Sequence, residues 1–285
     1  MTVAHHVKTD AAVTWGVALK NWPLTILASI KTLLRAPRIH PGERWLWPAG
    51  KLALATAAVI AVFALTQYFF DAAAIVYART LPRPLTDFFD WITDFGKSGW
   101  FLWPLGILFL VLAALQGRLS QASQVVMAAI MVRVGFLFVA VGIPGLFTTV
   151  AKQFIGRARP FVGGVADPYL FKPFTWAVAA WASLPSGHAT TVGSVLIAFG
   201  TLWPRSRPYL MIYALLILVS RVVVTAHHPS DVLAGLLVGA VGTLMVQHYF
   251  ALRRLAFVAG PAGQLHVYPS PSLKRIKSVA RELWA

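Results

Sequence analysis

Six apolar runs of 15 to 21 residues dominate the sequence and restrict the fold to a helical membrane bundle. They cover residues 52–70, 101–115, 134–151, 187–202, 209–226 and 232–252. About 20 apolar residues carry an α-helix across the hydrocarbon layer, where each backbone polar group must find a partner inside the protein. Of the 285 residues, 12% are charged, about half the share in a soluble domain. We therefore expect an all-α, polytopic membrane protein with six transmembrane helices.

The basic residues between and beyond these runs predict the topology. A formal net charge of +16 could indicate a nucleic-acid partner, but Lys and Arg beside apolar runs are typical of cytoplasmic loops. Basic segments at both ends predict that both termini are cytoplasmic. The segments 71–99, 152–185 and 227–230 then share the opposite, periplasmic side. Arg133 interrupts the third run, and we expect its side chain to extend to the cytoplasmic surface, with a buried ion pair as the alternative.

The chain divides into three parts. Residues 1–51 form a basic cytoplasmic or interfacial segment, residues 52–252 a six-helix domain, and residues 253–285 a basic cytoplasmic tail. Within the first part, Trp15 to Leu34 predicts an interfacial amphipathic helix, because a proline and two lysines argue against a full span. Trp45 and Trp47 predict an aromatic belt at the membrane surface. The polar N-terminus shows no cleavable signal peptide.

The turn between the fifth and sixth runs reads Ser-Arg-Val-Val-Val-Thr-Ala-His-His-Pro-Ser-Asp. It places Arg221, His227, His228 and Asp231 at the edge of hydrocarbon, where ionisable groups are costly and therefore functional candidates. A helix that starts near His228 would put Asp231 in its first turn, close to His227. A carboxylate there can bind one imidazole nitrogen and leave the other free to react. The alternative is an interfacial histidine pair beside a helix cap.

A basic cluster follows the third run. Lys152 and Arg159 are seven residues apart, so a helix that continues to Arg159 and ends at Pro160 would hold both on one face. Fixed cations at a helix end can clamp a phosphate group. The alternative is a set of basic residues that anchor the span at the membrane surface.

The sequence Pro-Ser-Gly-His precedes the fourth run. Ser186 and Gly187 would open that helix and leave its first backbone N–H groups free for an anion. Gly187 would allow the ligand to approach closely, and His188 in the first turn could act as an acid. The alternative is an ordinary helix cap beside an incidental histidine.

Together, Lys-x6-Arg-Pro, Pro-Ser-Gly-His and Ser-Arg-x5-His-x3-Asp, in this order, resemble the motifs of the type 2 phosphatidic acid phosphatase superfamily. The resemblance spans about residues 52–252. It implies a six-helix bundle and metal-independent hydrolysis of phosphate esters, with vanadium haloperoxidases among the relatives. It also implies that His227 is a nucleophile forming a phosphohistidine, that Asp231 orients it, and that His188 protonates the leaving oxygen and then activates water. The groups expected to hold the phosphate oxygens are Lys152, Arg159, Ser186, the Gly187 N–H and Arg221.

Residues beside the motifs receive secondary roles. Arg157 is expected to contact the phosphate or to support the site from behind, and His228 to line it. No pair of acids lies beside the motifs to bind a metal, so no metal or other cofactor is expected. Asp87, Asp90 and Asp94 fall on one helical face of the segment 71–99. They form either the solvated face of an interfacial helix or a lip that receives a cation-bridged lipid headgroup.

We therefore predict an integral membrane phosphatase acting on a lipid phosphate or pyrophosphate from the periplasmic face of a bacterial inner membrane. Phosphatidic acid, phosphatidylglycerophosphate, undecaprenyl pyrophosphate and lipid A phosphate all fit such a site. Its partners would be the lipid substrate and the bilayer, without nucleic acid. The nearest alternative is a phosphotransferase that passes the phosphoryl group to a lipid or sugar hydroxyl. Another is a non-catalytic transporter or scaffold. A vanadate haloperoxidase is disfavoured because that family is soluble.

Overall fold

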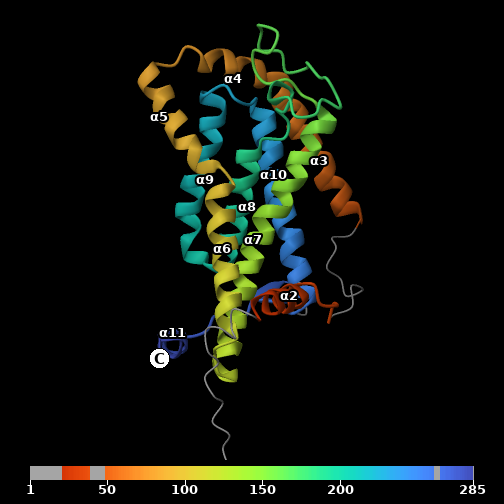
Figure 1. Ribbon diagram of the computed structural model, residues 1–285. Coiled ribbons are helices and arrows are strands. Elements are labelled where there is room, and N and C mark those ends of the chain that lie inside the picture. Colours follow the sequence, from red (N-terminus) through yellow and green to blue (C-terminus); the bar gives the residue numbers. More distant parts are fainter. Residues whose placement is uncertain (1–20, 39–48, 260–263, 285) are drawn as a thin grey trace, which may run out of the picture.

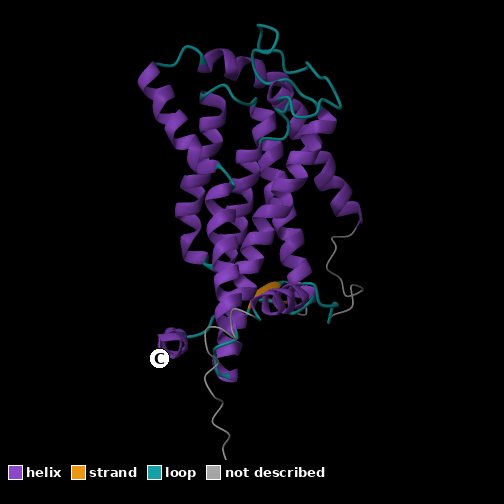
Figure 2. Ribbon diagram, in the orientation of Figure 1, coloured by secondary structure: helices purple, strands orange, loops and turns teal. Residues whose placement is uncertain are grey.

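The computed structural model describes residues 21–38, 49–259 and 264–284, and this part of the chain is mostly helical (Figure 1). The long helices are α3 (Ala49–Phe69), α6 (Gly99–Gln116), α7 (Gln121–Ile155), α8 (Gly187–Leu202), α9 (Arg207–Val223) and α10 (Pro229–Leu252). The shorter ones are α2 (Trp22–Leu33), α4 (Asp71–Ala78), α5 (Arg83–Thr93) and α11 (Leu273–Trp284). Three 3-10 turns, η1 (Asp94–Gly96), η2 (Ala179–Trp181) and η3 (Pro204–Ser206), and an antiparallel hairpin of β1 (Phe257–Ala259) and β2 (Leu265–Val267) complete the described structure (Figure 2).

Five helical stretches in the described residues are long and apolar enough to cross a membrane. They are α3, the stretch Arg83–Gln116 that contains α5, η1 and α6, then α7, the η3–α9 stretch Pro204–Val223, and α10. Each of the six predicted runs forms a helix, but α8 has only 16 residues. At 1.5 Å per residue that helix is about 24 Å long, shorter than a hydrocarbon layer of about 30 Å.

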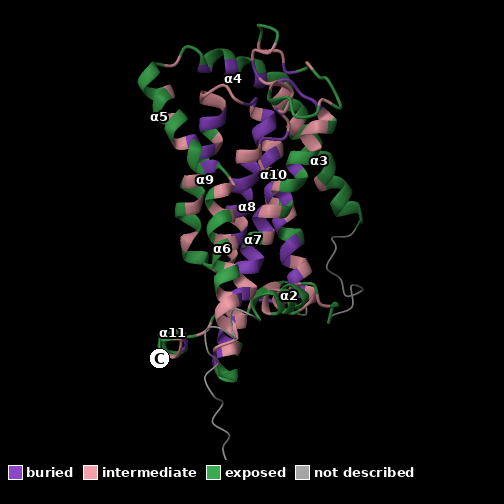
Figure 3. Ribbon diagram, in the orientation of Figure 1, coloured by how far each residue is buried: buried purple, intermediate pink, exposed green. Residues whose placement is uncertain are grey.

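Helices α8 and α10 form the centre of the bundle, with buried residues along both of them (Figure 3). Their backbones approach closely at two glycines. A Cβ on Gly235 would collide with the carbonyl oxygen of Ser186, and a Cβ on Gly239 with that of Thr190. The N-termini of α8 and α10 are joined directly, because the Ser186 N–H donates to the Asp231 carbonyl at 2.9 Å. This close packing places the two predicted motif turns side by side.

The polar segment 71–99 forms helices rather than an irregular loop. Helix α4 lies across the upper end of the bundle, and α5 descends beside α9 (Figure 1). The outer helix α3 is largely exposed and has no buried residue, and α6 is part exposed and part intermediate (Figure 3). Apolar helices with exposed apolar surface are what a lipid environment requires. At the upper end, the bundle is covered by α4, α5 and the connection between α7 and α8 (Figure 1).

Helix α7 is longer than the predicted span and continues below the bundle, where the described tail packs against it. The Arg133 guanidinium donates to the carbonyls of Ala129 and Tyr268, both at 2.7 Å, and to that of Pro269 at 3.1 Å. Its partners here are backbone carbonyls, two of them in the tail at the lower end of the bundle, and that this end is the cytoplasmic surface stays a prediction. Helix α11 lies on the first turns of α7 and buries Val279 there. The Glu282 carboxylate accepts hydrogen bonds from Ser120 at the N-terminus of α7.

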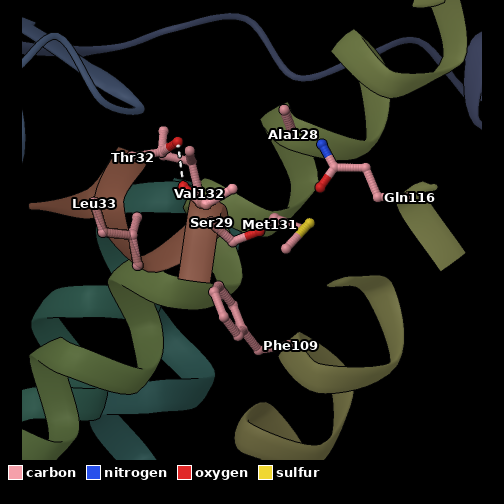
Figure 4. Close-up of a pocket in the computed structure, with 9 residues that line it drawn as sticks. Ser29, Thr32, Leu33, Phe109, Gln116, Ala128, Met131 and Val132 are labelled. Carbon is pink, nitrogen blue, oxygen red and sulfur yellow. Dashed lines mark hydrogen bonds between the residues drawn. The ribbon is translucent and has the colours of Figure 1, made fainter. Parts of the chain in front are cut away.

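Helix α2 occupies part of the segment predicted as an amphipathic helix and lies across the lower end of the bundle (Figure 1). The start of that predicted helix, residues 15–20, lies outside the described residues, as does the aromatic belt predicted at Trp45 and Trp47. Helix α2 packs on α6 and α7. A cavity of about 90 Å³ lies between them, and Figure 4 shows the residues that line it. Its lining includes Thr32 and Val132. Lys152 lies 20 residues further along α7, about 30 Å away, so this cavity is separate from the predicted site.

Candidate active site

His227 lies in the turn between α9 and α10 at the upper end of the bundle. Helix α9 ends at Val223, and the Arg221 carbonyl accepts the N–H groups of Ala226 and His227 at 3.1 and 3.2 Å. Helix α10 begins one residue after its N-cap, His228, as predicted. These bonds fix a tight turn and hold the His227 ring in the interior, with 1% of the residue exposed.

Asp231 lies close to His227, but the contact between them is indirect. The His227 Nδ1 and Asp231 Oδ2 atoms are 3.9 Å apart, beyond hydrogen-bond length. The Ser183 hydroxyl lies between them, donating to Asp231 Oδ2 at 2.6 Å and standing 3.5 Å from His227 Nδ1. Because Nδ1 faces this pair, Nε2 is the nitrogen that can face a ligand. The carboxylate also accepts the His228 backbone N–H at 2.9 Å.

The environment of His227 favours the neutral imidazole. Burial lowers its pKa well below the ordinary value of 6.5. Asp231 opposes this shift, whereas the positive charges of Lys152, Arg221 and Arg159 add to it. A neutral imidazole keeps a lone pair on the ring nitrogen that carries no proton, which a nucleophile requires.

Arg157 lies behind His227 rather than facing ligand space. Its side chain is fully buried and bonds two carboxylates, Asp231 Oδ1 at 2.5 Å and Asp71 Oδ2 at 2.7 Å. The guanidinium also donates to the Ser230 hydroxyl at 2.7 Å and to the Pro168 carbonyl at 3.0 and 2.8 Å. All three guanidinium nitrogens are thus engaged by protein. Of the two roles predicted for Arg157, this geometry fits support from behind.

The prediction that Lys152 and Arg159 share a helical face is wrong. Helix α7 ends at Ile155 because Gly156 adopts a left-handed conformation with φ of 61°, and a Cβ there would collide with the Lys172 carbonyl. Arg159 therefore lies in the following extended segment, where its N–H donates to a carbonyl of η2 at 2.8 Å. Its charge still interacts with that of Lys152. Burial lowers the pKa of Arg159, and Asp231 opposes this effect.

The Pro-Ser-Gly-His motif forms the predicted helix start. Ser186 is the N-cap of α8 and Gly187 its first residue. The Lys152 ammonium would lie 3.9 Å from a Cβ built on Gly187 and donates to the Ala182 carbonyl at 3.1 Å. The end of α7 and the start of α8 are thereby brought together. Ser186 Oγ and His188 Nε2 are buried and have no hydrogen-bond partner among the described residues.

Arg221 completes the cationic group from the end of α9. One guanidinium nitrogen donates to the Thr93 hydroxyl of α5 at 2.5 Å, while its Nε has no partner in the part of the chain that the structure describes. The nearby carboxylates of Asp90 and Asp94 interact with its charge. Asp94 also pairs with Lys97 at 2.7 Å on the exposed surface. Two residues of the acidic face predicted in the segment 71–99, Asp90 and Asp94, therefore border the site, and the role of that face as a lip for a bridging cation stays a prediction.

A cavity of about 440 Å³ opens beside His188. This volume lies within the range of pockets that bind small molecules. Its walls come from η1, α6, α7 and the first turns of α8, namely Gly96, Lys97, Ser98, Leu102, Gly142, Gly145, Leu146, Thr149, Gly187, His188 and Thr191. It therefore extends from the α8 N-terminus to the facing parts of α6 and α7.

Three residues that the sequence reasoning missed take part in this arrangement. Asp71 follows the first apolar run directly, so the argument that selected Arg221 from its position at the edge of hydrocarbon could have selected it too. Ser183 and Thr93 carried no comparable signal, because isolated hydroxyl residues are common in loops and helix ends.

The donor set suits an anion. Lys152, Arg159 and Arg221 gather around the α8 N-terminus, and no group of three or more His, Asp or Glu side chains is placed to hold a metal ion among the described residues. Cationic side chains and free helix N–H groups bind phosphate, whereas metal ions need neutral or negative donors. The fold and the site together define a helical membrane protein with a cluster of cationic side chains at one end of the bundle.

Comparison with known proteins identifies a family and several relatives of the chain. Residues 133–255 match the PAP2 superfamily. Two proteins named lipid A 1-phosphatase, from Rhizobium johnstonii and Rhizobium etli, are both 36% identical to the chain over 200 and 201 residues, covering 70% of it and 81% and 85% of themselves. The putative undecaprenyl-diphosphatase YbjG of Escherichia coli is 34% identical over 142 residues, which are 49% of this chain and 64% of that protein. The crystal structure of Aquifex aeolicus LpxE covers 63% of this chain and 95% of its own, with 19% identity and a TM-score of 0.45.

The chain belongs to the PAP2 superfamily and is a lipid phosphatase of that family. The resemblance predicted from the three motifs is thus confirmed at the level of the family. All three motifs fall inside the matched region, whereas Asp71 and Thr93 lie outside it.

Proposed function

We propose that the enzyme hydrolyses the 1-phosphate of lipid A, or a closely related lipid phosphate, through a phosphohistidine on His227. The observation that carries the proposal is a set of buried polar atoms without protein partners around that imidazole. Among the described residues these include Ser186 Oγ, His188 Nε2 and the Nε atoms of Arg159 and Arg221. Unpaired buried polar groups cost free energy and need an explanation, and a bound phosphate group would satisfy them. The lipid A substrate is supported by the two rhizobial relatives.

The first half-reaction transfers the phosphoryl group from lipid to protein. The lone pair of His227 Nε2 forms a bond to phosphorus as the bond from phosphorus to the lipid oxygen breaks. His188, protonated at this stage, gives its proton to that oxygen, so the lipid leaves as an alcohol. The cavity beside His188 lies on the side where this alcohol would depart.

The second half-reaction regenerates the enzyme. Neutral His188 takes a proton from water while the water oxygen bonds to phosphorus and the nitrogen–phosphorus bond breaks. Inorganic phosphate leaves, His227 returns to the neutral form, and His188 carries a proton again. The net change is one water consumed for each phosphate ester hydrolysed.

Positive charge around the phosphate provides most of the remaining catalysis in this proposal. The groups that would hold the non-bridging oxygens are Lys152, Arg159, Arg221 and the Gly187 N–H. In the transition state the negative charge of the phosphoryl group is spread over these oxygens. The donors are fixed before the substrate arrives, because each comes from a helix end or a bonded loop segment. Fixed donors in a buried site stabilise a transition state more than water does.

We also propose that residues 52–252 form one six-span catalytic domain. In this arrangement α8 crosses as a short central helix, and the basic segments 1–51 and 253–285 both lie on the cytoplasmic side. Helices α2 and α11 lie at the lower end of the bundle, opposite the site (Figure 1), which supports a periplasmic active site. Labelling of single cysteines at exposed Asp87 and Lys274 with a membrane-impermeant reagent tests this topology, since only the former should react in intact cells. Reaction of both residues, or of Lys274 alone, would overturn it.

Phosphate release by the purified protein tests the activity. Substrates are lipid A carrying a 1-phosphate, lipid A carrying only a 4′-phosphate, phosphatidic acid, phosphatidylglycerophosphate and undecaprenyl pyrophosphate. We expect the 1-phosphate to be preferred, and His227→Ala to abolish release while His248→Ala, on the same helix bundle but about 25 Å along α10 from Asp231, retains it. Release by His227→Ala would remove the nucleophile assignment. Transfer of label to an added alcohol instead of water would favour the phosphotransferase.

A further inference from the structure

Asp71 is a fully buried carboxylate at the upper end of the first span. It is the first residue of α4 and lies outside the region that matches the family. Its Oδ2 atom is 2.7 Å from the Arg157 guanidinium and accepts the Ser230 hydroxyl at 2.5 Å, while Oδ1 accepts the Ser230 N–H at 2.8 Å. Every contact is donated to Asp71, as an ionised carboxylate requires. Asp71 therefore binds the first turn of α10, two residues after His228.

Arg157 connects Asp71 to the carboxylate beside the nucleophile. The same guanidinium bonds Asp71 through one terminal nitrogen and Asp231 through the other, at 2.7 and 2.5 Å. All three side chains are buried with 0% exposure. The three side chains hold two negative charges and one positive charge, so one negative charge is in excess among them; in the free enzyme the charges of Lys152 and Arg159 also act on Asp231. An uncompensated buried charge is costly, and a cationic partner close to Asp231 would offset that cost.

His227 can supply that cationic partner only while it reacts. The imidazole is neutral when free and positively charged once it carries a phosphoryl group and a proton on Nδ1. Nδ1 faces Ser183 and Asp231. The other charged groups that interact with His227 are Lys152, Arg221 and Arg159, whose charges the phosphoryl oxygens would balance. The excess negative charge of the buried cluster is thus left to stabilise the imidazolium.

We infer that Asp71 is a positioning residue for the proposed phosphoryl transfer: by sharing Arg157 with Asp231, it preserves on Asp231 the negative charge that stabilises phosphorylated His227. Asparagine at this position would leave Arg157 to neutralise Asp231 alone. The inference rests on the proposed phosphohistidine mechanism. This role explains why Asp71 of α4 bonds Arg157 and Ser230 although its side chain contacts neither His227 nor the groups that would hold the phosphate.

The test compares Asp71→Asn with Asp71→Glu in the purified full-length enzyme. Asparagine retains the size of the side chain and removes its charge. Since Asp71 acts through one intermediary, we expect its kcat to fall about 10- to 100-fold, with KM within about twofold of wild type. Glutamate restores the charge and should recover most of the lost kcat. Thr243→Val is the matched control, because it removes a buried hydrogen bond of α10, the helix that Asp71 bonds, to the Ala140 carbonyl at 3.0 Å, without changing charge.

A purely structural role predicts a different pattern. Asp71→Asn and Thr243→Val would then lower thermal stability to similar extents and leave kcat per folded molecule unchanged. A kcat for Asp71→Asn within about twofold of wild type, in a preparation where His227→Ala is inactive, overturns the inference and leaves the proposed function standing. Retained hydrolysis in His227→Ala overturns the proposed function itself.

A double variant covers the case in which Asp71→Asn does not fold. Arg157→Gln leaves two unpaired carboxylates, whereas Asp71→Asn with Arg157→Gln leaves one, which restores the net charge of the wild-type cluster. We expect the double variant to be more stable than Arg157→Gln and at least about tenfold more active. A double variant no more active than Arg157→Gln alone would overturn the role of charge sharing.

Discussion

Replacing Gly96 with alanine is expected to slow turnover by displacing His188. Gly96 lies in η1, packed against the first turn of α8. A Cβ built at Gly96 would lie 2.9 Å from His188 Cδ2 and 2.6 Å from Ile217 Cγ2. Carbon atoms in favourable contact are about 3.5–4.0 Å apart, so the imidazole would have to move by roughly 0.6 Å or more.

A shift of that size affects proton transfer more than folding. Displacement of a reacting group by about 1 Å can cost about 100-fold in rate, so we expect a loss in kcat between about 10- and 100-fold. Overpacking of a core typically costs about 1–3 kcal/mol of stability. The backbone of Gly96 does not have a positive φ, so alanine adds a steric contact without backbone strain.

The assay is kcat and KM for phosphate release by purified protein, with thermal unfolding measured on the same samples. Gly99→Ala is the matched control, because its Cβ would meet only Trp103, at an ordinary contact distance of 3.5 Å. It lies three residues along the chain and should retain wild-type kcat. If Gly96→Ala folds and turns over within about twofold of wild type, His188 is not held where the chemistry needs it, and its role as the acid is refuted.

Three further predictions concern the surroundings of His227. Ser183→Ala removes the hydroxyl between His227 and Asp231. It should lower kcat about tenfold, the loss expected when one orienting hydrogen bond is removed, with little change in KM. A fall in 1/KM as large as the fall in kcat would contradict this prediction. Because burial lowers the pKa of His227 well below 6.5, the unfolded chain binds a proton there that the folded protein does not. Stability should therefore be fully present above pH 6.5 and fall as the pH is lowered toward the folded pKa; thermal unfolding of wild type and His227→Ala between about pH 5 and about pH 8 should show a shallower dependence in the variant. Phosphate release should persist after dialysis against a strong chelator, since cations take the place of a metal in the proposal, and loss of activity that added Mg²⁺ restores would contradict this.

The sequence predicted the helical elements of the core well because lipid makes hydropathy decisive. Five of the six apolar runs became helices within three residues of their predicted bounds, whereas α7 begins 13 residues before the predicted span. The two helix starts at Gly187 and Pro229 were recognisable from their capping sequences. The end of α7 was misplaced, because the left-handed turn at Gly156 depends on the close approach of the Lys172 carbonyl. A single glycine in the pattern does not reveal such a contact.

The site shows the same difference between residues that the sequence could predict and residues that it could not. Residues with motif spacing came together at the upper end of the bundle, since helix ends on one side of a membrane have few other places to lie. The partners behind them could not be predicted. Ser183 bonds Asp231 across 48 positions of the chain, and Asp71 bonds Arg157 across 86. No local pattern encodes such pairs.

The polarity of the helices explains how so many charges tolerate burial at one place. Lys152 lies in the last turn of α7 and Arg221 in the last turn of α9, whereas Asp231 lies in the first turn of α10. Each charge therefore sits at the helix end of opposite partial charge, an arrangement worth about 0.3–1 kcal/mol per group and up to about 2 kcal/mol where partly buried. The N-terminus of α8 has no acidic residue in its first turn, so its partial positive charge is left for the ligand. Thr190→Glu places a carboxylate there and should therefore weaken inhibition by inorganic phosphate. The control is Thr191→Gln, which adds a neutral side chain of similar length at the next residue and should weaken this inhibition less. Equal inhibition constants for the two variants would contradict an anion site at this helix end.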